Sequence, residues 1–117
     1  MYDLNEGSAA GRGFAVSGGV AGAVENMIRK ENPDAEVKTA RAEGLRDCRK
    51  LMAMAKAGKY NGYLLEGMAC PGGCVAGAGT LLPVDLAAKV VGRYQTEADV
   101  EDPTQSAYRD HGKSLEE

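Results

Sequence analysis

The sequence is poor in the residue types on which many binding sites and large cores depend. Among 117 residues it has no tryptophan, one phenylalanine, one histidine and three cysteines. So few cysteines exclude a disulfide-rich secreted scaffold and favour a reducing, cytoplasmic compartment. Because large aromatic side chains are scarce, small apolar residues and methionine must fill the core.

The charge balance and the hydropathy pattern exclude two further classes of protein. The 14 basic and 17 acidic side chains give a net charge of −3, without the basic excess that nucleic-acid binding requires. No apolar run reaches the roughly 18 residues of a membrane span. The N-terminus does not show a charged region followed by an apolar stretch, so we expect no signal peptide. This length predicts one domain with a modest core.

Hydrophobic periodicity predicts alternating helices and strands. Strand–helix–strand order favours a small α/β fold, in which helices pack on a small parallel-type sheet. We expect residues 1–97 to form one lobe and residues 98–117 to form a polar tail that is solvated or needs a partner. Ser17 is expected to cap the first long helix. The expected elements are helices over 17–30, 45–58 and 86–94 and strands over 35–40 and 62–68.

Two of the cysteines, Cys70 and Cys74, lie at the end of the second predicted strand, in a glycine-rich run. Pro71 suits the first position of a helix, so Cys70 is expected at the N-cap and Cys74 at the fourth helical position. Side chains at that spacing lie on one helix face, with Cβ atoms ~5–6 Å apart. Two such thiolates can hold a soft metal or an iron–sulfur cluster, but they cannot complete the site alone.

Two other interpretations of the cysteine pair remain open. Cys70 and Cys74 can be small buried hydrophobic residues, since free cysteine is often buried. They can also form half of a zinc site, although the single histidine, His111, lies far along the chain in the polar tail. The third cysteine, Cys48, has helical spacing with apolar neighbours and is expected in the core.

Three segments resemble one known family. The run Met68-Ala69-Cys70-Pro71-Gly72-Gly73-Cys74, followed by Gly77 and Gly79, resembles the last cysteine signature of the iron-only, or [FeFe], hydrogenases. The run Gly11 to Val20 resembles that family's Phe-Gly-x-Ser/Thr-Gly-Gly-Val segment. A weaker match lies between them, from Glu43-Gly44-Leu45 to Lys59-Tyr60. The resemblance covers about residues 7 to 97 in one register.

The resemblance implies a cofactor and a site. The family's active site is a [4Fe–4S] cluster joined through a cysteine sulfur to a diiron unit, and it reduces protons reversibly to H₂. Cys70 matches a ligand of the cluster, and Cys74 matches the cysteine that bridges to the diiron unit. Met68, Phe14 and Val20 match residues that line the diiron pocket.

The chain also departs from the family pattern. The two earlier signatures, Thr-Ser-Cys-Cys-Pro and Pro-Cys-x-x-Lys, are absent. We therefore expect a fragment of a ferredoxin-linked hydrogenase that is inactive alone, lacks both subclusters by itself, and needs the upstream half as its partner. A homodimer through uncovered faces is a further expectation. The alternatives are a hydrogenase-like iron–sulfur assembly or sensory protein without H₂ chemistry, and an interaction module with a structural CxxxC.

Overall fold

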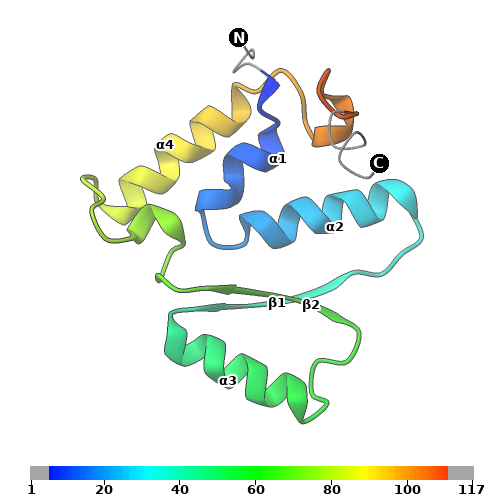
Figure 1. Cartoon of the computed structure of the whole chain (residues 1–117), viewed down its shortest axis with the longest axis vertical. Coiled ribbons are helices and arrows are strands. Elements are labelled where there is room, and N and C mark those ends of the chain that lie inside the picture. Colours follow the sequence, from blue (N-terminus) through cyan, green and yellow to red (C-terminus); the bar gives the residue numbers. More distant parts are fainter. Residues whose placement is uncertain (1–5, 111–117) are drawn as a thin grey trace.

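Two parallel strands lie between helices in the computed structural model, which describes residues 6–110 (Figure 1). Helix α3 covers one face of the strand pair, and α2 covers the other, with α1 and α4 beyond α2. In chain order the elements are α1 (Ala9–Arg12), a 3-10 turn (Gly13–Ala15), α2 (Gly19–Glu31), β1 (Lys38–Glu43), α3 (Leu45–Lys56), β2 (Tyr63–Met68), a 3-10 turn (Cys74–Ala76), α4 (Val84–Thr96) and a 3-10 turn (Pro103–Gln105).

The strand pairing confirms the predicted small α/β fold. β1 and β2 run parallel, from Lys38 opposite Tyr63 to Glu43 opposite Met68. Helix α3 makes the connection between the strands and packs on both. Both strands therefore end at one edge of the sheet, where open α/β sheets place their ligands.

The core is built from small side chains, as the composition predicts. The buried hydrophobic residues are Ala21 on α2, Ala42 on β1, Leu51 on α3 and Val75 after β2. Among residues 6–110, no large side chain is completely buried. Several apolar side chains consequently stay exposed, and Leu81 is the extreme case with 97% of its surface accessible.

The first long helix begins differently from the prediction. Gly18, with φ of 88°, is the N-cap of α2, and the Ser17 side chain makes no capping hydrogen bond to the helix. The carboxylate of Glu66 on β2 caps the helix instead. It accepts from the Gly18 N–H at 2.7 Å and from the Ala21 N–H at 3.0 Å. Ser17 was therefore the wrong cap, because a buried acid on the neighbouring strand takes this role.

The remaining elements follow the periodicity, with one shift. The helices predicted over 45–58 and 86–94 are confirmed as α3 and α4, and the strand over 62–68 as β2. The strand predicted over 35–40 is displaced to Lys38–Glu43. The Ala35 N–H donates to the Asn32 carbonyl at 3.0 Å, so the turn after α2 extends through the first predicted strand positions.

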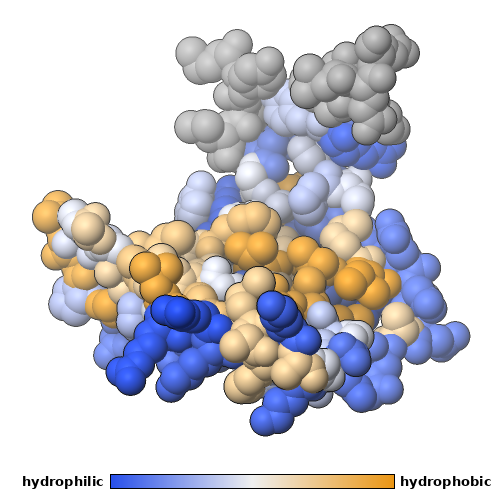
Figure 2. All heavy atoms as spheres, turned by 60° about the horizontal axis from the view of Figure 1, so that its bottom comes forward, coloured by the Kyte–Doolittle hydropathy of each residue, from blue (hydrophilic) through white to orange (hydrophobic). Residues whose placement is uncertain are grey.

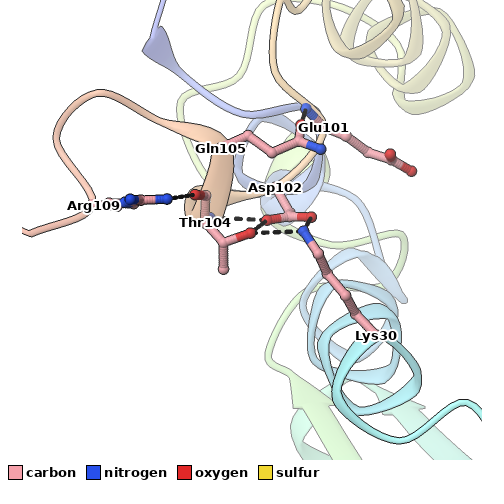
Figure 3. Close-up of polar contacts among 6 residues, drawn as sticks. All are labelled: Lys30, Glu101, Asp102, Thr104, Gln105 and Arg109. Carbon is pink, nitrogen blue, oxygen red and sulfur yellow. Dashed lines mark hydrogen bonds and ion pairs between the residues drawn. The ribbon is translucent and has the colours of Figure 1, made fainter.

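Residues 98–110 lie against the body of the molecule. The N–H groups of Ala9 and Ala10 donate to the carbonyls of Val100 and Glu101, at 2.8 and 3.0 Å. The ammonium of Lys30 lies 2.9 Å from the buried Asp102 (Figure 3). These hydrogen bonds and the ion pair attach the segment to α1 and α2, while many of its residues stay exposed. The residues from His111 onward lie outside the described residues, and no helix within 6–110 is long and apolar enough to span a membrane.

Candidate functional site

The five residues predicted for the site all line one cavity at the carboxyl edge of the sheet. Phe14 lies in the turn before α2, Val20 in the first turn of α2, Met68 at the end of β2, and Cys70 and Cys74 in the loop that follows. The cavity has a volume of about 570 Å³ and is almost entirely apolar. Its lining consists of Phe14, Ala15, Val20, Gly67, Met68, Ala69, Cys70 and Cys74.

The loop that carries the two cysteines does not form the predicted α-helix. Gly72 and Gly73 have φ values of 94° and 99°, in the left-handed region that glycine favours. The Gly73 N–H donates to the Cys70 carbonyl at 2.9 Å, which closes a turn, and Cys74 then begins a 3-10 turn. Cys70 is therefore not a helix N-cap. Both cysteines still line the same cavity, although they do not share a helix face.

Residues 69–77 form a loop that we call the cysteine loop. Its glycines allow it to pack closely against the turn before α2. A Cβ atom added at Gly73 would lie 2.6 Å from both the Ala15 carbonyl oxygen and the Ser17 nitrogen. The Ser17 N–H donates to the Gly72 carbonyl at 3.0 Å. Two of the three segments that resemble the hydrogenase family, Gly11 to Val20 and Met68 to Gly79, are thus in direct backbone contact.

A carboxylate at the end of β1 also holds the cysteine loop. The Gly72 N–H donates to Glu43 at 2.9 Å. The nearby Ser17 hydroxyl, and next the Gly72 N–H, stabilise the carboxylate and lower the pKa of Glu43. The sequence analysis did not predict this role for Glu43 or the helix-capping role of Glu66. For Glu66, the sequence did contain a signal: an acidic residue within the apolar run of β2 indicates a buried carboxylate with hydrogen-bond partners.

The three thiols occupy different environments. Cys74 is exposed and Cys70 is half-buried, so neither behaves as a buried hydrophobic residue. Cys48 is half-buried on α3, and its thiol donates to the carbonyls of Met68 at 3.5 Å and Ala42 at 3.6 Å. It packs against the sheet, as expected of a core position, and does not line the cavity.

The cavity lining includes two cysteines and a methionine, and no histidine or acidic residue. Within residues 6–110, no group of three or more histidine, cysteine, aspartate or glutamate side chains is arranged to hold a metal ion. The cavity therefore offers sulfur donors in apolar surroundings, a combination typical of sites for soft metals.

Fold and site together define a small α/β protein with a thiol-bearing, apolar cavity at its sheet edge. The family model for the iron only hydrogenase large subunit, C-terminal domain, matches residues 2–78, about two-thirds of the chain. The chain belongs to this family. The matched stretch contains every predicted site residue and ends before α4. A search of curated proteins found no match.

Proposed function

We propose that this chain supplies two cysteine ligands, Cys70 and Cys74, to the active-site cluster of an [FeFe]-hydrogenase-type enzyme. The enzyme would catalyse the reversible reaction 2H⁺ + 2e⁻ ⇌ H₂. The observation that supports this most strongly is the cavity itself: residues from the two segments that resemble the family most clearly, Gly11 to Val20 and Met68 to Cys74, line one apolar space.

The donor set fits an iron–sulfur group. Thiolates are the usual ligands of iron–sulfur clusters, and apolar surroundings with few competing donors tune their potential. In the proposal Cys70 and Cys74 would hold the [4Fe–4S] cluster and the diiron subcluster through their thiolates. When bound, the cluster supplies the electrons and the iron at which protons are reduced.

The other residues of the chain would position and shield this group. Phe14, Val20 and Met68 line the cavity, where they would exclude water from the reacting centre. Glu43 and the Ser17 backbone fix the cysteine loop through Gly72, so the thiols have a defined position relative to β2.

Further ligands must complete the site in this proposal, because a cluster of this kind takes four protein ligands. We propose that the upstream half of the catalytic domain supplies the rest, with ferredoxin or a similar protein as electron carrier in a reducing cytoplasm. Figure 2 shows hydrophobic residues gathered in a band across the face presented there, bordered by hydrophilic ones. Phe14 and Leu82 are 46% and 47% exposed, and an additional lobe could cover such side chains.

The test is anaerobic reconstitution with iron and sulfide, on the chain alone and co-produced with an upstream hydrogenase half that carries the two absent signatures. We expect iron and a [4Fe–4S] signal in electron paramagnetic resonance from the reduced complex, and loss of both in Cys70→Ser/Cys74→Ser. Cys48→Ser is the matched control, since Cys48 does not line the cavity, and it should retain the iron.

H₂ evolution from reduced dye separates the remaining alternatives. The chain alone should show none, and turnover without a partner would contradict the need for a second half. A complex that binds iron through Cys70 and Cys74 but never produces H₂ would favour the iron–sulfur assembly or sensory alternative. Iron retained in the double variant would show that the CxxxC is structural.

A further inference from the structure

One edge of β2 has no strand beside it. Within residues 6–110 the sheet consists of β1 and β2 alone, so the side of β2 that faces away from β1 presents backbone groups without strand partners. We propose that this free edge pairs with the same edge of a second copy of the chain, in antiparallel orientation, and forms a four-stranded sheet. The proposal goes beyond the iron–sulfur function and does not depend on it, since it requires neither iron nor an upstream half.

The hydrogen bonds of β2 identify the backbone groups at the free edge. The N–H of Gly44, which follows β1, donates to the Met68 carbonyl at 2.8 Å, so the backbone groups of Met68 face β1. In a strand, the N–H and C=O of one residue point to the same side, and those of the next residue point to the opposite side. The backbone groups of Gly67 and Leu65 therefore point to the free edge, together with the carbonyl of Tyr63.

The groove beside this edge is apolar. It has a volume of about 230 Å³ and is lined by Val20, Ala21 and Val24 from α2 and by residues 64–68 of β2. Glu66 is the one acid in this lining, and its carboxylate is already engaged with N–H groups at the start of α2. The free edge thus combines backbone donors and acceptors with apolar side chains, and such an edge favours pairing with another strand.

The outer edge of β1 carries charges instead. Two hollows are lined by β1 but by no residue of β2, and their charged side chains are Arg41 and Glu43 from the strand, Glu25 from α2, and Asp47 and Lys50 from α3. Charged side chains beside an edge strand oppose pairing with another chain. The contrast between the two edges indicates that β2 is the strand that accepts a neighbour.

The strand β2 is its own complement in one register. With a two-fold axis at Leu65, this residue lies opposite Leu65 of the second copy, and the two exchange both of their N–H···O bonds. Gly67 lies opposite Tyr63 of the second copy, so each Gly67 N–H donates to a Tyr63 carbonyl. The Tyr63 N–H keeps its bond to the Tyr60 carbonyl at 3.0 Å. A shift by two residues would leave outward-facing groups at the end of each strand unpaired, so this register makes the most hydrogen bonds.

The side chains favour the same register and the same partner. Tyr63 is 39% exposed and would cover Gly67 of the second copy, where the strand has no side chain of its own. Glu66 would lie opposite Leu64 instead of Glu66 of the second copy, so no like charges face each other directly. A second copy therefore supplies an aromatic cover and an apolar neighbour at the positions where this edge needs them.

Antiparallel pairing keeps the two cysteine loops apart. Met68 lies three residues beyond Leu65, so the two copies of Met68 would be roughly 20 Å apart along the strands, at ~3.3 Å per residue. The loops would lie at opposite ends of the four-stranded sheet, and one cluster could not take thiols from both copies. Dimer formation and cluster binding are therefore separate properties of the chain.

The experiment is size-exclusion chromatography with light scattering on the reduced, metal-free chain over a series of concentrations. We expect the mass to rise with concentration from 12.2 kDa toward twice that value. Val24→Lys places a charge in the groove of each copy and should raise the dissociation constant of the dimer at least about tenfold. Val90→Lys is the matched control, because Val90 is also exposed on a helix but does not line the groove, and it should leave the dissociation constant unchanged.

Amide hydrogen exchange of the wild type tests the pairing without any substitution. The N–H groups of Leu65 and Gly67 should exchange more slowly as the concentration rises, because they gain acceptors in the dimer. The N–H of Arg41, which strand alternation places at the outer edge of β1, should exchange at the same rate at every concentration.

Several results would overturn the proposal. These are a mass of one chain at every concentration up to millimolar, a dimer that a folded Val24→Lys leaves intact, or slower exchange at Arg41 in place of Leu65. Protection of Leu65 that appears only on co-production with an upstream half would also overturn it, because that half would then occupy the edge. Circular dichroism of Val24→Lys separates loss of the interface from loss of the fold. Because neither measurement uses iron, failure here leaves the iron reconstitution result unaffected, and the reverse also holds.

Discussion

The cysteine loop and the C-terminal segment, residues 98–110, are both held by carboxylates, but the carboxylates bind different kinds of partner. Glu43 accepts from the backbone N–H of Gly72. Asp102 accepts from the side chain of Lys30 and from Thr104, which contributes both its backbone N–H and its hydroxyl (Figure 3). The carboxylate at the cysteine loop thus binds main chain, whereas Asp102 binds mainly side chains, although two backbone hydrogen bonds also join the C-terminal segment to α1.

This difference determines how firmly each region is positioned. A backbone donor has no rotamers, and Gly73 adds a contact that leaves no space for a side chain. The Lys30 side chain is 47% exposed, so its ion pair is screened by solvent and costs side-chain entropy. Firm positioning of the cysteine loop suits a metal centre, which needs its ligands at fixed positions. The C-terminal segment carries no predicted ligand and only has to stay attached. Three substitutions test this contrast, from the largest expected effect to the smallest.

Gly73→Ala should have the largest effect. The new methyl group would meet two backbone atoms at 2.6 Å, and φ of 99° is unfavourable for alanine. Overpacking and backbone strain together predict a loss of about 2–4 kcal/mol in the free energy of unfolding. Urea denaturation followed by circular dichroism measures it.

Gly22→Ala is the control for that substitution. Gly22 lies in α2, and a Cβ atom added there would have no atom of another residue within 4 Å, apart from its chain neighbours and the backbone of its own helix. Alanine should therefore be neutral or should stabilise the helix by about 0.5–1 kcal/mol. Equal losses at Gly22 and Gly73 would show that the cysteine loop is not the more tightly packed region.

Local patterns predicted most of the fold, because α3, α4 and β2 are specified by their own periodicity. The gathering of Phe14, Val20 and Met68 with the cysteines around one cavity followed from the resemblance, not from spacing. The α-helix predicted from Pro71 does not form. Proline favours the first position of a helix, but two successive glycines follow it. Their positive φ values end any helix there.

The sequence did not predict the hydrogen bonds of the carboxylates of Glu66 and Asp102, because their partners are distant in sequence. Glu66 reaches donors at Gly18 and Ala21, and neither residue type signals a hydrogen bond to a particular acid. Asp102 pairs with Lys30 across most of the chain. Polarity alone therefore predicted a solvated tail, whereas the ion pair and two backbone hydrogen bonds attach residues 98–110 to α1 and α2.

Glu66→Gln should have an intermediate effect. The carboxylate accepts two backbone hydrogen bonds in a buried position, whereas an amide offers one oxygen and turns its N–H₂ toward a second donor. One buried N–H would lose its acceptor, at a cost of about 1–3 kcal/mol. Thermal and urea unfolding measure the loss. Glu25→Gln, which breaks only the pair with Arg29 within α2, should cost about 0.3–0.5 kcal/mol. A smaller loss at Glu66 than at Glu25 would contradict the capping role.

Asp102→Asn should have the smallest and most local effect, and it should depend on pH. The hydroxyl of Thr104, and next the ammonium of Lys30, hold the pKa of Asp102 below its usual range. A lowered pKa in the folded state stabilises the protein above the unfolded value of about 3.9, and this contribution is lost as pH falls through the folded pKa. The difference in free energy of unfolding between wild type and Asp102→Asn should therefore be largest near neutral pH and should decrease below about pH 4. Glu43, whose pKa is also lowered, is present in both proteins, so its effect cancels in the difference.

Amide hydrogen exchange shows whether that effect stays local. The N–H groups of Ala9 and Ala10 donate to residues 100 and 101, so their exchange reports attachment of the C-terminal segment. Asp102→Asn should accelerate exchange at these two amides and leave Ala21, which donates to Glu66, unchanged. Added salt should act in the same direction as the substitution, because it screens the exposed Lys30. If Ala21 also exchanged faster, the segment would be coupled to the start of α2, and the cavity wall at Val20 would depend on the tail.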